Sequence, residues 1–121
     1  MKIALFIVWC LLFVGCNTTN IHHERYYQTK LCEQMNGQME YRLFDATRVD
    51  CLTSEYAIEV DFGTKWAQSV GQSLYYAKIS GKKPSVALIV DKSKKEQRYL
   101  KRLKILARDY GIKVFEINKE E

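Results

Sequence analysis

Several kinds of site and segment are excluded by what this sequence lacks. It has no Cys-x-x-Cys pair and no Cys/His spacing typical of zinc sites, and its two histidines, His22 and His23, have no further metal ligands nearby. Its main apolar run, residues 3–14, is shorter than the roughly 20 residues that a transmembrane helix needs. The sequence has no internal repeat and no low-complexity segment. Its 121 residues therefore leave room for one small domain.

The apolar run is typical of an export signal, because Lys2 supplies a short positive region in front of it. Its end, LFVGC, resembles the lipobox of bacterial lipoproteins, although Phe13 stands where leucine is usual. The resemblance implies a signal peptide at residues 1–15 and a lipidated Cys16, followed by a polar tether that completes residues 16–23. Such a protein would be anchored at the bacterial cell envelope, facing the periplasm or the exterior. An ordinary secretory signal and an uncleaved anchor are the alternatives.

Two of the four cysteines remain for the folded domain. Cys10 belongs to the signal and Cys16 would carry the lipid, which leaves Cys32 and Cys51 as an even pair in an oxidising compartment. We therefore predict a disulfide between Cys32 and Cys51, with two buried free thiols as the alternative. The bond would tie the first helix to a strand and, in the chain-entropy account, add roughly 3 kcal/mol of stability.

Residues 24–121 have the periodicities of a single α/β domain. Apolar residues recur every four positions over residues 24–36, which predicts an amphipathic helix. Three alternating stretches with short connections, QMEYRLF, TRVDCLT and YAIEVDF, predict an antiparallel meander. We then expect a helix over residues 64–80, a buried strand at SVALIVD, a helix capped by Ser93 and a strand at IKVFEI. The predicted order is α-β-β-β-α-β-α-β, in a mixed sheet flanked by helices.

Three acidic residues are expected to gather on one face of the meander. Alternation places Glu59 and Asp61 on the same face of their strand, and hairpin pairing brings Asp50 close to Glu59. Like charges at short distance are unfavourable unless a cation or a proton joins them. Mg²⁺ and Mn²⁺ prefer oxygen ligands alone, so the three acids predict a site for one of these ions. Three solvated carboxylates on an exposed sheet face are the alternative.

The same acids and the helix after them resemble the core of the PD-(D/E)XK nuclease superfamily. The resemblance rests on Asp50, the sequence EVD at residues 59–61, and a helix that carries Gln72 and Tyr76. That helix is similar to the Q-x-x-x-Y helix of the superfamily's RecB-like branch. The resemblance covers roughly residues 24–117 and implies a restriction-endonuclease-like core, with the element order predicted above.

The resemblance also implies a metal site. Asp50 and Glu59 would bind Mg²⁺ or Mn²⁺, with the backbone carbonyl of Val60 beside them. The family's lysine, which positions or activates the attacking water, is replaced here by Asp61. An acid cannot supply that positive charge. Asp61 would then add a ligand to a site without catalysis, unless another residue supplies the charge.

Residues near the motif offer such a charge and a further acid. Lys65 follows helical spacing with Gln72 and Tyr76, so the three share one helix face. We predict that Lys65 replaces the missing lysine and that Gln72 and Tyr76 orient the substrate or the water. An ordinary surface lysine is the alternative for Lys65. The superfamily often carries one more acid on its first helix, and Glu33 and Glu40 are the candidates here.

Two functions follow as expectations, beside a third, structural interpretation in which the chain is an envelope lipoprotein whose fold is a relic and whose acids are solvated. The first is an exported, lipid-anchored, metal-dependent nuclease that hydrolyses phosphodiester bonds. The second is an inactive nuclease-like module that binds nucleic acid or a protein partner at the envelope. The formal net charge of +5 fits an anionic partner, as it fits many ordinary surfaces. The basic residues of the third predicted helix are interpreted as a solvated face, with contact to a phosphate backbone as the alternative.

Overall fold

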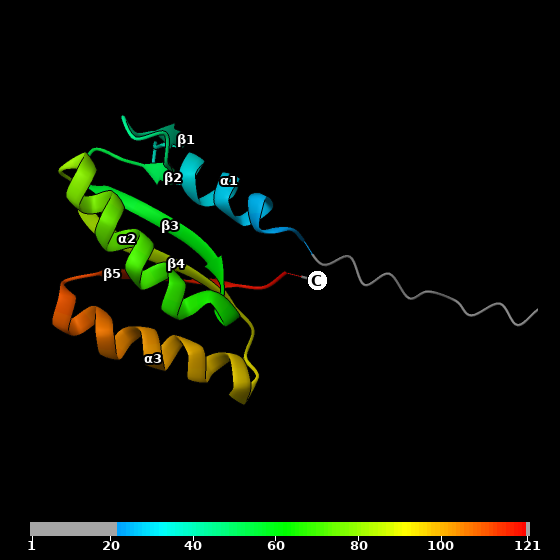
Figure 1. Ribbon diagram of the computed structural model, residues 1–121. Helices are drawn as coiled ribbons and strands as arrows, with labels where there is room; N and C mark the ends of the chain where they lie inside the picture. The colour runs from blue at the N-terminus through cyan, green and yellow to red at the C-terminus, as the bar shows by residue number, and fades with distance from the viewer. Residues whose placement is uncertain (1–21, 121) are drawn as a thin grey trace, which may run out of the picture.

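A computed structural model describes residues 22–120, so the predicted signal peptide, the lipidation of Cys16 and most of the tether lie outside the described residues. Helices pack against the strands of one sheet (Figure 1). The elements are α1 (Glu24–Gln34), β1 (Gln38–Arg42), β2 (Arg48–Leu52), β3 (Tyr56–Phe62), the 3-10 helix η1 (Gly63–Lys65), α2 (Trp66–Ser80), β4 (Lys83–Val90), α3 (Lys94–Tyr110) and β5 (Lys113–Asn118). The predicted α/β class is confirmed.

The five strands form one mixed sheet in the order β1-β2-β3-β4-β5. The first three strands pair antiparallel, as predicted for a meander. β3, β4 and β5 pair parallel, and each parallel connection runs through a helix, first α2 and then α3. The element bounds differ from the predicted ones by a few residues. The largest difference in type is the 3-10 turn η1 at the start of the second predicted helix.

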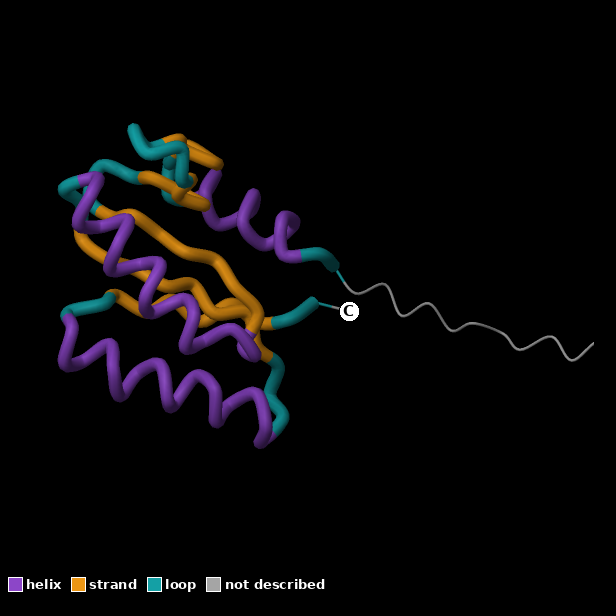
Figure 2. Tube along the Cα trace, viewed as in Figure 1, coloured by secondary structure: helices purple, strands orange, loops and turns teal. Residues whose placement is uncertain are grey.

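Different helices cover the two faces of the sheet (Figure 2). Successive residues of β4 point to opposite faces, so this strand reports what covers each one. Leu88 is in a cluster with Val70 of α2 and Leu103 of α3. Ile89 is in a second cluster with Tyr27 of α1. The strand is thus buried on both sides, as its unbroken apolar sequence predicts.

A disulfide joins α1 to β2. Cys32 and Cys51 are bonded and both are buried, which confirms the predicted pair. Gly37, in the turn between α1 and β1, lies directly against this bond, and a Cβ atom there would overlap both sulfurs. The position therefore requires glycine for reasons of space.

α3 begins at its predicted cap. The Ser93 side chain accepts a hydrogen bond of 3.3 Å from the Glu96 N–H. The Glu96 carboxylate does not complete a capping box, because it lies 3.1 Å from the Lys119 ammonium in an ion pair. The helix ends at Gly111, whose φ of 65° is in the left-handed region. Within residues 22–120, no helix has both the length and the apolar character needed to cross a membrane.

Candidate functional site

The candidate site lies where the antiparallel ladder between β2 and β3 ends. Cys51 and Ile58 are the last pair of this ladder in the direction of Asp50. Continuing the register places Asp50 opposite Glu59, as predicted. The Asp50 side chain takes the place of strand pairing there, because its Oδ2 accepts a hydrogen bond of 2.8 Å from the Val60 N–H. Its carboxylate is therefore fixed between the two strands.

Glu59 is a buried acid with one unpartnered oxygen. The residue is 5% exposed, and its Oε2 has no hydrogen-bond partner among the described residues. The pKa of Glu59 is raised to about 10. Burial has the largest effect, and the charge of Asp50 and a hydrogen bond with Asp50 add to it. Burial also raises the pKa of Asp50, against the effect of the Val60 N–H. At neutral pH the pair therefore shares a proton, which reduces the repulsion between the two carboxylates.

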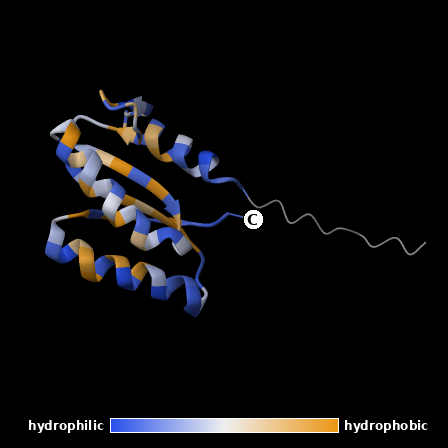
Figure 3. Ribbon diagram, viewed as in Figure 1, coloured by the Kyte–Doolittle hydropathy of each residue, from blue (hydrophilic) through white to orange (hydrophobic). Residues whose placement is uncertain are grey.

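Asp61 is buried on the same face but has different partners. It is 4% exposed, and the Ser69 hydroxyl of α2 donates a hydrogen bond of 2.6 Å to its Oδ2. Burial raises the pKa of Asp61, while the Ser69 bond and the charge of Lys65 oppose the rise. The alternative of solvated acids is therefore wrong for Glu59 and Asp61. Both are hydrophilic positions within a largely hydrophobic β3, whose alternating bands are visible in Figure 3.

The three predicted metal-binding acids do not form one ligand group. Within residues 22–120, no group of three or more His, Cys, Asp and Glu side chains is arranged to hold a metal ion. Asp50 and Glu59 form a two-carboxylate pair, while Asp61 bonds to Ser69 and Glu24. Mg²⁺ commonly takes one or two carboxylates and keeps several waters. The pair fits such an ion, and Asp61 does not extend it.

Lys65 lies at the rim of these acids, at the end of η1. Its ammonium is 3.9 Å from the Glu24 Oε2, and its side chain is 52% exposed. Its charge acts to lower the pKa of both Glu24 and Asp61. Lys65 is therefore turned toward the site, as its predicted role requires, although an exposed pair at this distance adds little stability.

Gln72 and Tyr76 approach the pair from α2. Burial, followed by the charge of Glu59, raises the pKa of Tyr76, and a hydrogen bond with Gln72 opposes this rise. Asp50 contributes in the same direction as Glu59. Tyr76 is therefore near enough to Glu59 and Asp50 for their charges to act on it, while the roles predicted for Gln72 and Tyr76 stay predictions.

The acid that α1 brings to the site is Glu24, which was not predicted. Burial, followed by the charge of Asp61, raises the pKa of Glu24 to about 7. Of the two predicted candidates, Glu33 is exposed. Glu40 lies closer to the site, since it accepts a hydrogen bond of 3.0 Å from Gln28 and its charge raises the pKa of Asp50.

Helical spacing combined with the disulfide would have found Glu24. The residues Glu24, Gln28 and Cys32 recur every four positions, so they share one line along α1. The bond from Cys32 to Cys51 turns that line toward β2. Gln28 confirms this orientation, because its amide donates a hydrogen bond of 2.9 Å to the Asp50 carbonyl.

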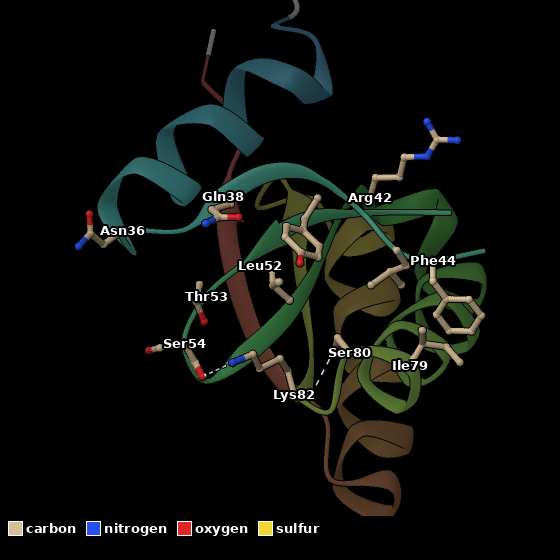
Figure 4. Close-up of a pocket in the computed structure, with 12 residues that line it drawn as sticks. Asn36, Gln38, Arg42, Phe44, Leu52, Thr53, Ser54, Ile79, Ser80 and Lys82 are labelled. Carbon is tan, nitrogen blue, oxygen red and sulfur yellow. Dashed lines mark hydrogen bonds between the residues drawn. The ribbon is translucent and has the colours of Figure 1, made fainter. Parts of the chain in front are cut away.

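A separate pocket of about 550 Å³ lies between the β1–β2 hairpin and the end of α2 (Figure 4). On one side the Lys82 ammonium donates a hydrogen bond of 2.9 Å to the Ser54 carbonyl, drawn as a dashed line. Arg42 and Lys82 are among its lining residues, which include no carboxylate and none of the predicted site residues. The pocket therefore offers a hard metal ion no charged ligand.

No family model, curated protein or solved structure matches the chain. The chemistry of the buried and half-buried acids Asp50, Glu59, Asp61 and Glu24, which we call the acid site, is therefore the main guide to function.

Proposed function

We propose that this protein is a metal-dependent nuclease with a restriction-endonuclease-like fold, which hydrolyses phosphodiester bonds. The observation that carries this proposal is the Asp50/Glu59 pair in the opening between β2 and β3, where one buried Glu59 oxygen has no partner. Burying two adjacent carboxylates is costly unless their charge is compensated. A divalent cation would compensate it and would accept the unpartnered oxygen as a ligand.

The arrangement of the elements supports the same proposal. An antiparallel meander precedes α2 and the parallel strand β4, which is the order that the resemblance implies for the superfamily core. The Gln72/Tyr76 face of α2 lies over the acids, as the resemblance also implies. The superfamily assignment rests on these features together with the sequence motif.

In the proposed site, Asp50 and Glu59 hold Mg²⁺ or Mn²⁺, and the Val60 carbonyl lies beside them. When bound, the ion supplies Lewis acidity toward the phosphate and lowers the pKa of a water. Glu24, with a pKa of about 7, is suited to accept a proton near neutral pH. Lys65 offers positive charge to the phosphate from the rim, and Gln72 and Tyr76 orient the substrate or the water.

The proposed location is the bacterial cell envelope, with an N-terminal lipid as the membrane anchor. The Cys32–Cys51 disulfide supports a compartment outside the reducing cytosol. The lipobox-like sequence before Cys16 supports the anchor. The protein would then face the periplasm or the exterior.

A second candidate function is binding of nucleic acid or a protein partner without cleavage. It is favoured by Asp61, which stands where the family has its lysine and is held by Ser69 inside the fold. The amine predicted to replace the lysine, that of Lys65, belongs to a side chain that is 52% exposed. In this function the metal pair would stabilise the fold or orient a ligand.

A cleavage assay separates the two functions. The full-length chain in a non-ionic detergent is incubated with single- and double-stranded DNA and RNA, with Mg²⁺, Mn²⁺ or EDTA. We expect cleavage only when metal is present, and a rate at least ~100-fold lower for Glu59→Gln. Mutating a residue that merely hydrogen-bonds to a metal ligand already lowers activity ~10–100-fold, so loss of a ligand should cost at least as much. Glu33→Gln is the matched control, since Glu33 is exposed on α1.

Metal-dependent cleavage that is equal in wild type and Glu59→Gln would contradict the proposed site. Absence of cleavage, with binding of a polynucleotide retained, would establish the second function. Loss of both would overturn both proposals.

A further inference from the structure

The outer surface of α3 is strongly basic. The helix carries seven Lys and Arg residues and two acids, Glu96 and Asp109. Glu96 is buried and paired with Lys119, so it does not neutralise the outer surface. Within residues 22–120, none of the seven α3 cations takes part in an ion pair. This surface therefore has positive charge available for an anionic partner.

Helical spacing divides most of these cations into two sets of three on opposite flanks of the helix. All six side chains are exposed. The inner flank, which faces α2, consists of Lys95, Arg98 and Arg102, and the outer flank, which faces β5, consists of Lys101, Lys104 and Arg108.

Contacts fix the direction of each flank. The Arg102 guanidinium lies 6.0 Å from the ring centres of both Trp66 and Tyr99, which places the inner flank beside the start of α2. Gln97, on the other side of the helix, lies 3.5 Å from Glu116 of β5. The two flanks thus have the same number of cations but different neighbours, and the exposed Asp109 lies on the inner flank at its C-terminal end.

The inner flank approaches the residue next to Lys65, at the rim of the acids. Trp66 follows Lys65, whose ammonium is 3.9 Å from the Glu24 carboxylate. At the same end, Gly63 packs so closely against Tyr99 that a Cβ atom would lie 3.1 Å from its ring. The starts of α1, α2 and α3 and the end of β3 all lie toward the same end of the molecule (Figure 1).

We propose that the inner flank and Trp66 bind a single-stranded polynucleotide and lead it to the acid site. The three cations would contact successive phosphates, and the half-buried Trp66 indole, which already packs beside a guanidinium, would stack on a base. A single strand is favoured over a duplex because its bases are free to stack. The inference rests on the proposed function, since it makes nucleic acid the ligand of the acid site.

Tryptophan fluorescence reports this contact directly. The chain has two tryptophans, Trp9 in the predicted signal and Trp66, so Trp9→Phe leaves Trp66 as the single emitter whether or not the signal is removed. The full-length Trp9→Phe protein is reconstituted in neutral phosphatidylcholine vesicles and titrated with oligothymidylate in EDTA, which allows binding without cleavage. We expect quenching of Trp66 and an apparent Kd that rises steeply with salt. No quenching and no binding would overturn the inference.

Two triple variants with the same change in charge test the direction. We expect Gln at all three inner-flank positions to weaken binding about 100-fold and to reduce the salt slope by about 2, from roughly 0.7 for each of three phosphates. Gln at all three outer-flank positions should weaken it less than about 3-fold. Equal losses of affinity in the two triple variants would overturn the inference that the inner flank binds the strand. Arg102→Gln alone, expected to cost about 5-fold, serves if a triple variant fails to fold.

Further arms separate this inference from its alternatives. In vesicles with phosphatidylglycerol, a Trp66 emission change that needs the inner flank, without any response to the oligonucleotide, would overturn the inference in favour of an anionic membrane. Flank-specific binding without cleavage would retain the inference and remove the nuclease. If the inner-flank variant cleaves the substrate with an unchanged KM, the nuclease proposal stands and the inference about the inner flank is overturned.

Discussion

The two edges of β3, one paired with β4 and the other with β2, differ in how they pair and in what they bury. Toward β4, it pairs along its whole length, from Tyr56 to Phe62, and the β4 residues 86–89 within this pairing are apolar and fully buried. Toward β2, the ladder stops at Cys51, and an acidic side chain occupies the space where pairing would continue. We call these the β3–β4 seam and the β2–β3 opening. The seam contributes apolar burial, whereas the opening places costly carboxylates inside the fold. One edge of β3 therefore stabilises the fold through strand pairing, while its other edge holds the acids of the candidate site.

The largest expected effect is a loss of stability in the seam. Leu88 lies next to Asp61 in the β3–β4 register and is fully buried. Leu88→Ala should lower the free energy of unfolding by about 3 kcal/mol, from lost burial and the cavity left behind. Urea unfolding of the full-length chain measures it. The loss should be the same with Mn²⁺ and with EDTA, and a loss confined to one condition would break the separation of seam and opening.

The disulfide should hold the strand that borders the opening. Removing it in the double variant Cys32→Ala/Cys51→Ala should cost roughly 3 kcal/mol of stability. It should also weaken Mn²⁺ binding, because β2 carries Asp50 beside Cys51. Thermal unfolding with and without a reductant provides the check in the wild type. Equal melting temperatures in the two conditions would contradict this role.

The opening should make stability depend on pH. Glu59 has an ordinary pKa of 4.5 and a folded pKa of about 10, so the folded state keeps a proton that the unfolded state releases. Without metal, stability should therefore be fully present below about pH 4.5 and fall as pH rises toward 10, by up to about 1.4 kcal/mol per pH unit. Glu59→Gln should flatten this fall, and so should saturating Mn²⁺.

The control for this pH dependence is Glu33→Gln, which removes an exposed acid from α1. Its denaturation midpoints at pH 6 and pH 9 should follow those of the wild type. If Glu59→Gln retains the full pH dependence, the buried pair is not its source.

The smallest expected effect concerns Asp61. Ser69→Ala removes the hydroxyl that donates to Asp61, and should cost about 1 kcal/mol above neutral pH and less in acid, where Asp61 is protonated. Ser73→Ala is the matched control, because that hydroxyl bonds to the Val70 carbonyl within α2. Chemical denaturation of both variants at two pH values gives the comparison. Identical pH profiles would show that Ser69 does not stabilise the ionised Asp61.

The features that follow from local pattern were predictable. Alternation located the meander strands, helical spacing located the three helices, and counting cysteines gave the Cys32–Cys51 bond. The pairing of Asp50 with Glu59 followed from the length of the turn between their strands. These features depend on residues near one another in the chain, or on chemistry that leaves one partner available.

The features that depend on what packs over a face were not predictable in the same way. Alternation put Glu59 and Asp61 on one face, but it does not say that α2 covers that face. The opening depends on one side chain-to-backbone bond, from the Val60 N–H to Asp50, which leaves no periodic signal. Glu24 was missed because the apolar stripe of α1 alone was used to orient the helix. The disulfide rotates the helix so that the line from Glu24 to Cys32 faces β2.

We expect the proposed Asp50/Glu59 site to bind one divalent cation in exchange for a proton. Calorimetric titration of the full-length chain with Mn²⁺ at pH 7, in two buffers of different ionisation enthalpy, measures both quantities together. We expect one ion bound and about one proton released per ion, with both lost in Glu59→Gln. Absence of Mn²⁺ binding, or binding that Glu59→Gln leaves unchanged, would contradict it.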